Sequence, residues 1–265
     1  MAFPAQANRS LPPMDGHPPK YWILLQDKDK ASAVALSPTA IAGRKLQNLT
    51  VDDTDQPVSA IYLNKLKQEG IQAICQSRWL NAVSVRLTPD QYAKVAKMPF
   101  VKAIQSIDPS IVITSIALPA TLNMAPVMSQ IQAPDFTRAG LTGRFVNVGV
   151  IDAGFFGADS ANALKHVFAR DGVKRVRDYV NEKKTHSDLF RTLESNADFH
   201  GTEVLAAIAG SDPTENIQFG LATDATFYLA RSDQGNREYR GEEDNWVAAM
   251  EWMDSLGVRL INTSL

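Results

Sequence analysis

Asp152 is the first residue whose type and position suit it to chemistry. It directly follows Val146–Ile151, a nearly continuous apolar run that is typical of a strand with both faces covered, and Ala153-Gly154 then lets the chain turn sharply. Functional side chains of open α/β sheets gather at the carboxyl ends of the strands. Asp-x-Gly is also common in turns and helix caps, so Asp152 alone leaves a purely structural role open.

His200 is the second such residue, because it opens a predicted apolar helix that ends at Gly210. The positive end of the helix dipole disfavours a cation, which biases this imidazole toward the neutral form that a general base requires. A histidine in such a place can also do no more than form hydrogen bonds near a helix cap. That is the interpretation we give to His17, His166 and His186.

Asp152 and His200 are more informative as a pair. Both are expected at the carboxyl edge of one parallel sheet, with the aspartate first in the chain and the histidine second. The same order and placement occur in the catalytic triad of subtilisin, in which the carboxylate orients the imidazole that activates a serine.

The elements that must position this pair predict a parallel sheet. Further strands are predicted at 226–230 and 258–262, and between them a helix with apolar positions at 244–256 ends before Gly257. Strands that alternate with helices are typical of a doubly wound α/β sheet with right-handed crossovers. The sequence stops directly after the last strand without a helix to cover it, so we expect an incomplete domain.

The first part of the chain has a different pattern, in the order strand, helix, strand, strand, helix, strand. This is the ferredoxin-like, or split βαβ, arrangement of an α+β domain. Its helices are predicted to begin at a Ser59 cap and at Thr88-Pro89, and a further short helix is predicted at 38–49. The predicted strands cover residues 21–25, 71–77, 80–87 and 100–107. The predicted division is a disordered lead-in at 1–19, this domain at 20–107, a linker at 108–125 and the α/β part at 126–265.

Composition excludes several classes of protein. The chain has 265 residues, of which 45% are hydrophobic and 21% charged, as in ordinary globular domains. A net charge of −2 argues against a strongly electrostatic partner such as nucleic acid or an anionic membrane. Cys75 is the single cysteine and cannot form a disulfide within the chain. No apolar run is long enough to span a bilayer, and the first residues lack the pattern of a signal peptide.

The chain resembles the subtilisin-like serine proteases (subtilases, peptidase family S8), and most of all the secreted enzymes of Bacteroidetes-type bacteria. The resemblance is carried by four segments in order, which are Val148–Gly154, His200–Ala206, Gly220–Ala230 and 251–265. Residues 20–107 look like the inhibitory propeptide of the family, whose fold is also ferredoxin-like. The match covers about residues 20–265.

The resemblance implies peptide-bond hydrolysis through an acyl-enzyme. Asp152 would orient His200, and His200 would act first as general base and then as general acid. It also implies polypeptide substrates, a propeptide that packs on the protease domain, a secreted protein and no cofactor. Structural calcium occurs in the family, but this sequence shows no ligand set for it. Ala153 stands where many subtilases have Thr or Ser.

The nucleophile of the family is missing from the sequence. Subtilases carry it in a Gly-Thr-Ser-x-Ala/Pro motif, whereas Gly201-Thr202 is followed here by Glu203, and Ser264 has no preceding glycine. The asparagine of the oxyanion hole is likewise expected beyond residue 265. Loss of the serine costs on the order of 10⁶-fold in kcat in subtilisin. We therefore expect this chain alone to be inactive.

Other functions fit the sequence less well. Gly149, Gly154 and Gly157 do not have the spacing of a dinucleotide fingerprint, and Asp152 stands where a pyrophosphate would need bare amides. A metal hydrolase lacks support, because no two histidines are four residues apart and there is no cysteine pair. The stronger alternative is a catalytically dead fragment or an inhibitor or chaperone module, in which residues 20–107 bind a protease domain supplied in trans.

Overall fold

The structure is a computed structural model, and its contacts divide the chain into two units. The first comprises 1–35, 51–110 and 239–244, and the second comprises 36–50, 111–238 and 245–265. The structure describes residues 17–29, 34, 36–107, 124–181, 186–212, 214, 217–235 and 242–264. The predicted lead-in up to residue 16 and the predicted linker up to residue 123 lie outside these residues. The last two residues of the predicted linker, 124 and 125, begin a helix in the structure.

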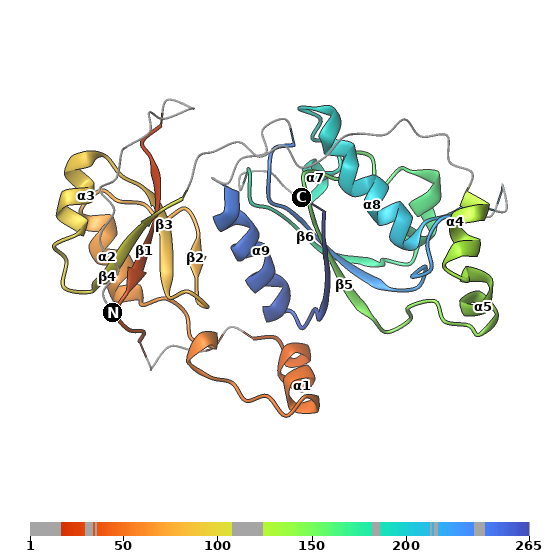
Figure 1. The fold of residues 1–265 in the computed structure, drawn as a ribbon, viewed down its shortest axis with the longest axis horizontal. Coiled ribbons are helices and arrows are strands. Elements are labelled where there is room, and N and C mark those ends of the chain that lie inside the picture. The colour runs from red at the N-terminus through yellow and green to blue at the C-terminus, as the bar shows by residue number, and fades with distance from the viewer. Residues whose placement is uncertain are drawn as a thin grey trace. The chain divides into compact units, whose positions relative to one another are not determined.

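The first unit is built on a four-stranded sheet in the order β2-β3-β1-β4, and its adjacent strands are antiparallel (Figure 1). This is the strand order of the predicted split βαβ arrangement. Both predicted caps are confirmed, since Ser59 Oγ accepts from Tyr62 and Thr88 forms a capping box with Gln91. The elements are β1 (Lys20–Leu25), η1 (Asp53–Asp55), α2 (Ala60–Gln68), β2 (Gln76–Ser77), β3 (Ala82–Arg86), α3 (Pro89–Val95) and β4 (Val101–Ser106).

The predicted strand at 71–77 is much shorter in the structure, where only Gln76–Ser77 is regular strand. Two consecutive residues before it pair with one residue of β3. The amide of Ile74 donates to the carbonyl of Ser84 at 2.8 Å, and the amide of Ser84 donates to the carbonyl of Cys75 at 2.9 Å. The Ser84 hydroxyl also accepts the Cys75 amide at 3.0 Å. Such a two-against-one pairing interrupts a regular ladder.

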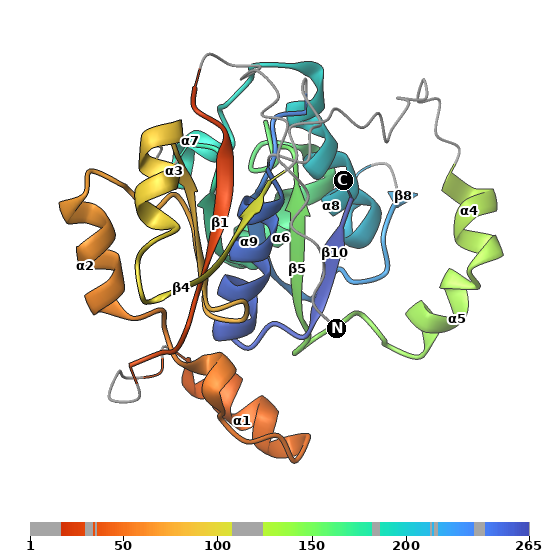
Figure 2. The same ribbon diagram turned by 60° about the vertical axis from the view of Figure 1, so that its left-hand side comes forward.

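The second unit contains a four-stranded sheet in the order β10-β5-β9-β6, in which every pairing is parallel. Strand β10 lies beside β5 at one edge (Figure 2). The strands of the sheet are β5 (Asn147–Asp152), β6 (Val173–Asp178), β9 (Thr226–Arg231) and β10 (Leu260–Thr263). The remaining elements are α1 (Pro38–Leu46), α4 (Met124–Gln130), α5 (Ala133–Arg138), η2 (Asn162–Leu164), α6 (Lys165–Ala169), α7 (His186–Leu189), η3 (Asn196–Phe199), α8 (His200–Ala209), β7 (Ser211–Asp212), β8 (Ile217–Gln218) and α9 (Glu243–Ser255).

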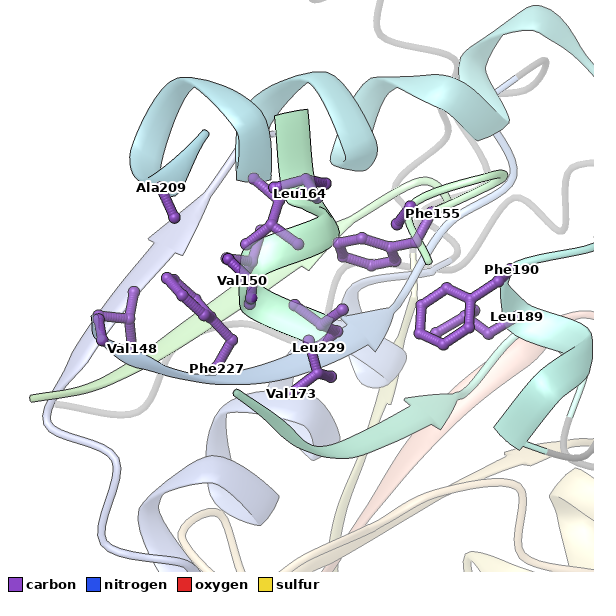
Figure 3. Packing of buried hydrophobic residues seen from close by; sticks show 14 residues of the cluster. Val148, Val150, Phe155, Leu164, Val173, Leu189, Phe190, Ala209, Phe227 and Leu229 are labelled. Carbon is purple, nitrogen blue, oxygen red and sulfur yellow. The ribbon is translucent and has the colours of Figure 1, made fainter. Parts of the chain in front are cut away.

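Helices cover both faces of this sheet, which confirms the predicted doubly wound architecture. Val148 and Val150 of β5 pack in one core with Leu205 of α8, as Figure 3 shows for the two valines. Ile151, the next residue along β5, packs in a second core with Met253 of α9. Because side chains alternate along a strand, these two cores lie on opposite faces of the sheet.

Strand β6 was not predicted, and its composition explains why. Its sequence is Val-Lys-Arg-Val-Arg-Asp, and Lys174 and Arg175 are exposed. Since β6 is one of the two edge strands of the sheet, it does not carry the continuous apolar run that identifies the central strands.

Residues 36–50 lie between β1 and α2 in the chain, yet they belong to the second unit. The amide of Ser37 donates to the carbonyl of Ser255 at 2.8 Å, and Arg44 pairs with Asp254 at 2.8 Å. Both partners lie in the last turn of α9. The carbonyls of a helix C-terminus have no partner within the helix, and a cation is favoured there. Helix α1 is therefore held at the end of α9.

Candidate active site

Asp152 is the last residue of β5. The sequence had placed it directly after the strand, so the strand extends one residue further than predicted. Its side chain is completely buried. Oδ1 accepts the backbone N–H of Ala153 at 2.8 Å, while the Asp152 carbonyl accepts the amide of Ser232, just after β9, at 3.2 Å. The strand pairing thus fixes both the backbone and the direction of this carboxylate.

His200 is the first residue of α8, as predicted, and its side chain meets Asp152. The imidazole Nδ1 lies 3.0 Å from Asp152 Oδ1, and the side chain is 42% exposed. An ionised carboxylate only accepts hydrogen bonds, so Nδ1 carries the proton of this contact, and in the neutral ring Nε2 then keeps its lone pair. The structure therefore brings together the two residues that the sequence singled out, with one ring nitrogen left to take a proton from another group.

Burial raises the pKa of the Asp152 carboxyl from 3.8 to about 7, because a charge is costly in an apolar interior. The charge of His200, its hydrogen bond and that of the Ala153 amide lower this pKa, and the nearby Asp233 raises it further. Within the part of the chain that the structure describes, Oδ2 of Asp152 has no hydrogen-bond partner. The carboxylate is thus held by His200 and one amide in a place that otherwise disfavours charge.

Two glycines, Gly154 and Gly201, allow the segment around His200 to approach the turn after β5. The amide of Gly201 donates to the carbonyl of Gly154 at 2.9 Å. A Cβ on Gly201 would overlap that same carbonyl oxygen, and a Cβ on Gly154 would lie 2.6 Å from the Cα of Asp198. The sequence indicated a turn at Gly154 but did not show that its missing side chain makes room for the histidine segment.

Comparison with known families identifies both parts of the chain. The model of the subtilase family matches residues 143–265. Residues 143–265 belong to the subtilase family. The model of the peptidase S8 propeptide domain of Bacteroidota matches residues 20–118, and this stretch is the propeptide domain. None of the curated proteins matches the chain significantly.

Solved structures with the same fold include a serine-to-alanine mutant of the epidermin leader peptide processing serine protease (EpiP) from Staphylococcus aureus. It has a TM-score of 0.57 and 13% identity, and the match covers 94% of this chain and 50% of that chain. A second EpiP structure from the same organism has a TM-score of 0.49 and 13% identity, with 92% and 49% covered. The chain thus spans about half the length of these structures, and the likeness to the mutant structure shows a shared fold.

Three other residues that the sequence analysis considered, Thr202, Ser264 and Gly149, take part in hydrogen bonds or packing of the fold. The Thr202 hydroxyl donates to the carbonyl of Phe156 at 2.9 Å, and the Ser264 hydroxyl accepts from Asn262 Nδ2 at 2.7 Å. A Cβ on Gly149 would overlap the sulfur of Met253, so this glycine serves the packing of β5 against α9.

Arg231 is the residue near the site that sequence reasoning missed. It ends β9 and is 1% exposed. Its guanidinium donates to the carbonyl of Ala153, next to Asp152, and to the side chain of Asp198, two residues before His200. A signal was present, because an arginine directly after the apolar run 226–230 is unusual at the edge of a buried parallel strand.

Among the residues described here, no helix is long and apolar enough to cross a membrane.

Proposed function

We propose that this chain is part of a serine endopeptidase that hydrolyses peptide bonds through an acyl-enzyme. Asp152 and His200 are two members of its Asp-His-Ser triad. The observation that carries this proposal is the 3.0 Å contact between His200 Nδ1 and Asp152 Oδ1 at the carboxyl edge of a parallel sheet in a subtilase domain. Polypeptides are the substrates, and the reaction needs no cofactor.

In the proposed reaction Nε2 of His200 takes the proton of a serine hydroxyl as the oxygen attacks the peptide carbonyl. Asp152 holds Nδ1–H and stabilises the imidazolium that forms. The same imidazolium then gives its proton to the leaving amine, and a water molecule repeats the sequence to release the acyl group. The partial exposure of the His200 side chain supports this role, because the imidazole must reach groups outside the domain core.

The serine and the side-chain donor of the oxyanion hole are proposed to lie outside the 265 residues of this sequence. The Gly-Thr-Ser-x-Ala/Pro motif is missing here, and the matched structures are about twice as long as the match. The chain by itself is therefore proposed to hydrolyse peptides no faster than background.

The propeptide domain is proposed to pack on the subtilase domain and to inhibit it until it is removed. Residues 36–50 support this proposal, because they lie within the stretch matched by the propeptide model but are grouped with the subtilase unit. A secreted destination is proposed from the family.

The test is a fluorophosphonate probe, which labels a serine only when a histidine activates it. The complete reading frame that contains these residues is labelled together with its His200→Ala variant, and residues 1–265 are labelled alone. We expect label on the complete product only, and none on His200→Ala. Label on the His200→Ala variant, on residues 1–265 alone, or on none of the samples would overturn the proposal.

A second candidate function is inhibition or chaperoning of a separate protease domain by the propeptide. It is favoured by the complete four-stranded sheet of the first unit and its own apolar core. The chain, added to a mature subtilase of the same family, would slow peptide hydrolysis at submicromolar concentration. Unchanged hydrolysis at a tenfold excess of the chain would remove this candidate.

A further inference from the structure

Arg231 lies at the same sheet edge as the proposed catalytic aspartate. In the register of the sheet it pairs with Asp152 of β5 on one side and with Asp178 of β6 on the other. It is among the largest fully buried side chains of the described residues. Burial of a guanidinium is costly unless acceptors surround it. The groups that Arg231 contacts therefore indicate its role.

The guanidinium of Arg231 contacts both backbone segments that carry the catalytic pair. Nε donates to the carbonyl of Ala153, the residue after the aspartate, at 2.8 Å. One terminal nitrogen donates to Asp198 Oδ1 at 3.1 Å and to Glu194 Oε2 at 3.2 Å. The other terminal nitrogen lies 3.7 Å from Asp178 Oδ2. One planar group thus joins the ends of two strands to the segment that leads into α8.

Asp198 passes this constraint on to His200, which follows it by two residues. Its second oxygen accepts the backbone N–H of Glu194 at 2.6 Å and of Ser195 at 2.7 Å. Ser195 in turn caps η3, the single turn that leads directly into His200. The start of α8 is therefore fixed by a carboxylate whose other oxygen is held by Arg231.

We propose that Arg231 is a positioning residue of the catalytic pair, which it holds in register by bonding to Ala153 on one side and Asp198 on the other. This inference rests on the proposed function. Arg231 acts through geometry, since the groups that set the pKa of Asp152 are its burial, His200, Ala153 and Asp233. Lysine could replace the charge but not the fork of donors, which reaches several acceptors in fixed directions. A net gain in stability is a weaker reason for the residue, because buried ion pairs contribute little on balance.

The test observes the Nδ1–H proton of His200 by NMR in the full chain, identified by its loss in Asp152→Asn. In Arg231→Lys we expect this proton to exchange with water at least about tenfold faster than in the wild type. In the complete enzyme we expect kcat to fall on the order of 10²-fold with little change in KM, because the reacting groups are misplaced and not removed. A merely structural role would change stability and leave both readouts unchanged.

The matched control is Arg191→Lys, because Arg191 also binds a carboxylate with both terminal nitrogens, at 2.6 and 2.9 Å from Asp159, but is largely exposed. Its substitution should leave the His200 proton unchanged. A folded Arg231→Lys variant with wild-type exchange and kcat overturns the inference. If that variant does not fold, the same two measurements are made on Asp198→Asn, and wild-type exchange and kcat in that variant overturn the inference. Absence of an Asp152-dependent His200 proton in the wild type overturns the proposed function instead.

Discussion

A buried carboxylate in each unit shows how differently the two parts of the molecule treat charge. Asp55 of the propeptide domain is 2% exposed, and both of its oxygens have partners. One accepts from the Arg78 guanidinium at 3.2 Å, and the other accepts from the backbone N–H of Asp52 at 3.1 Å. Asp152 of the subtilase domain is completely buried, and within the described chain one of its oxygens has no hydrogen-bond partner.

The difference separates Asp55, a carboxylate that serves the fold, from Asp152, which is proposed to serve a reaction. Asp55 is ion-paired and completes the capping box of η1, so its burial is compensated locally. Asp152 is compensated only in part, and the uncompensated burial raises its pKa to about 7. Strongly shifted pKa values cluster at functional sites for this reason, since the reaction uses an interaction that the resting fold leaves incomplete.

The largest expected effect is the loss of activity in His200→Ala, which removes the imidazole that contacts Asp152 Oδ1 at 3.0 Å. In the complete enzyme kcat should fall on the order of 10⁶-fold, as in subtilisin, because the general base is gone. Steady-state peptide hydrolysis measures it. His17→Ala, an exposed histidine of the first unit, is the matched control and should keep wild-type kcat. A loss of less than about 100-fold would show that another residue serves as the base.

Asp55→Ala should have the largest effect on stability. It leaves the Arg78 guanidinium, whose side chain is 12% exposed, without this carboxylate, and breaking a buried ion pair costs about 3–5 kcal/mol. Hydrogen exchange of the β1 and β3 amides would measure the loss of protection. Asp53→Ala, an exposed aspartate in the same turn, should cost less than about 0.5 kcal/mol. Equal costs for the two variants would mean that Asp55 is no better placed than a surface residue.

Asp152→Asn should stabilise the fold, whereas Asp55→Ala destabilises it. The pKa of this carboxyl is about 7 in the folded protein and 3.8 in the unfolded chain, so the folded state binds the extra proton between these values. The contribution of the wild-type carboxyl to stability therefore falls as pH rises from about 4 to 7 and stays low above it. We expect Asn to raise the free energy of unfolding at pH 8 by on the order of 1–3 kcal/mol, less than the full shift because a bond to His200 is weakened.

Urea unfolding of Asp152→Asn and wild type at pH 4 and pH 8 measures this effect. The gain should be present at pH 8 and much smaller at pH 4, where the carboxyl is protonated in the folded state and only about half ionised in the unfolded chain. A variant that is less stable than wild type at pH 8 would show that Asp152 is as well compensated as Asp55.

The sequence was sufficient to predict the elements that carry Asp152 and His200 and the pair that they bring together. The central strand β5 and the helix that begins at His200 have strong apolar patterns, so both side chains could be placed at one sheet edge before the structure was known. The split βαβ order of the first unit also followed from caps and prolines such as Thr88-Pro89. These features depend on residues that are close together in the chain, so they can be read from the sequence alone.

The features that the sequence could not predict depend on long-range contacts. Arg231 meets Asp198 and Ala153 only after the sheet has formed, and the edge strand β6 carries too many charges to show an apolar pattern. Helix α1 was predicted as a helix of the propeptide domain, but no local signal could assign it to the end of α9.

The smallest expected effect concerns the contact between α1 and the end of α9. Arg44 and Asp254 pair at 2.8 Å with side chains 15% and 31% exposed, so they represent a third case beside Asp55 and Asp152, a charge pair that water reaches. Arg44→Ala should lower protection of the Ser37 amide, which donates to Ser255, by no more than about 1 kcal/mol. The difference should shrink in 0.5 M salt, because exposed charges are screened.

Hydrogen exchange of that amide measures the change, and Lys45→Ala, the exposed neighbour of Arg44, is the control. A salt-independent loss above about 2 kcal/mol would contradict the expectation, since only a desolvated pair resists screening. Arg44 would then hold α1 in the way that Arg231 holds the segment before His200. The expected result assigns the two arginines different tasks, because water reaches the Arg44 pair and weakens it, whereas Arg231 is buried among its partners.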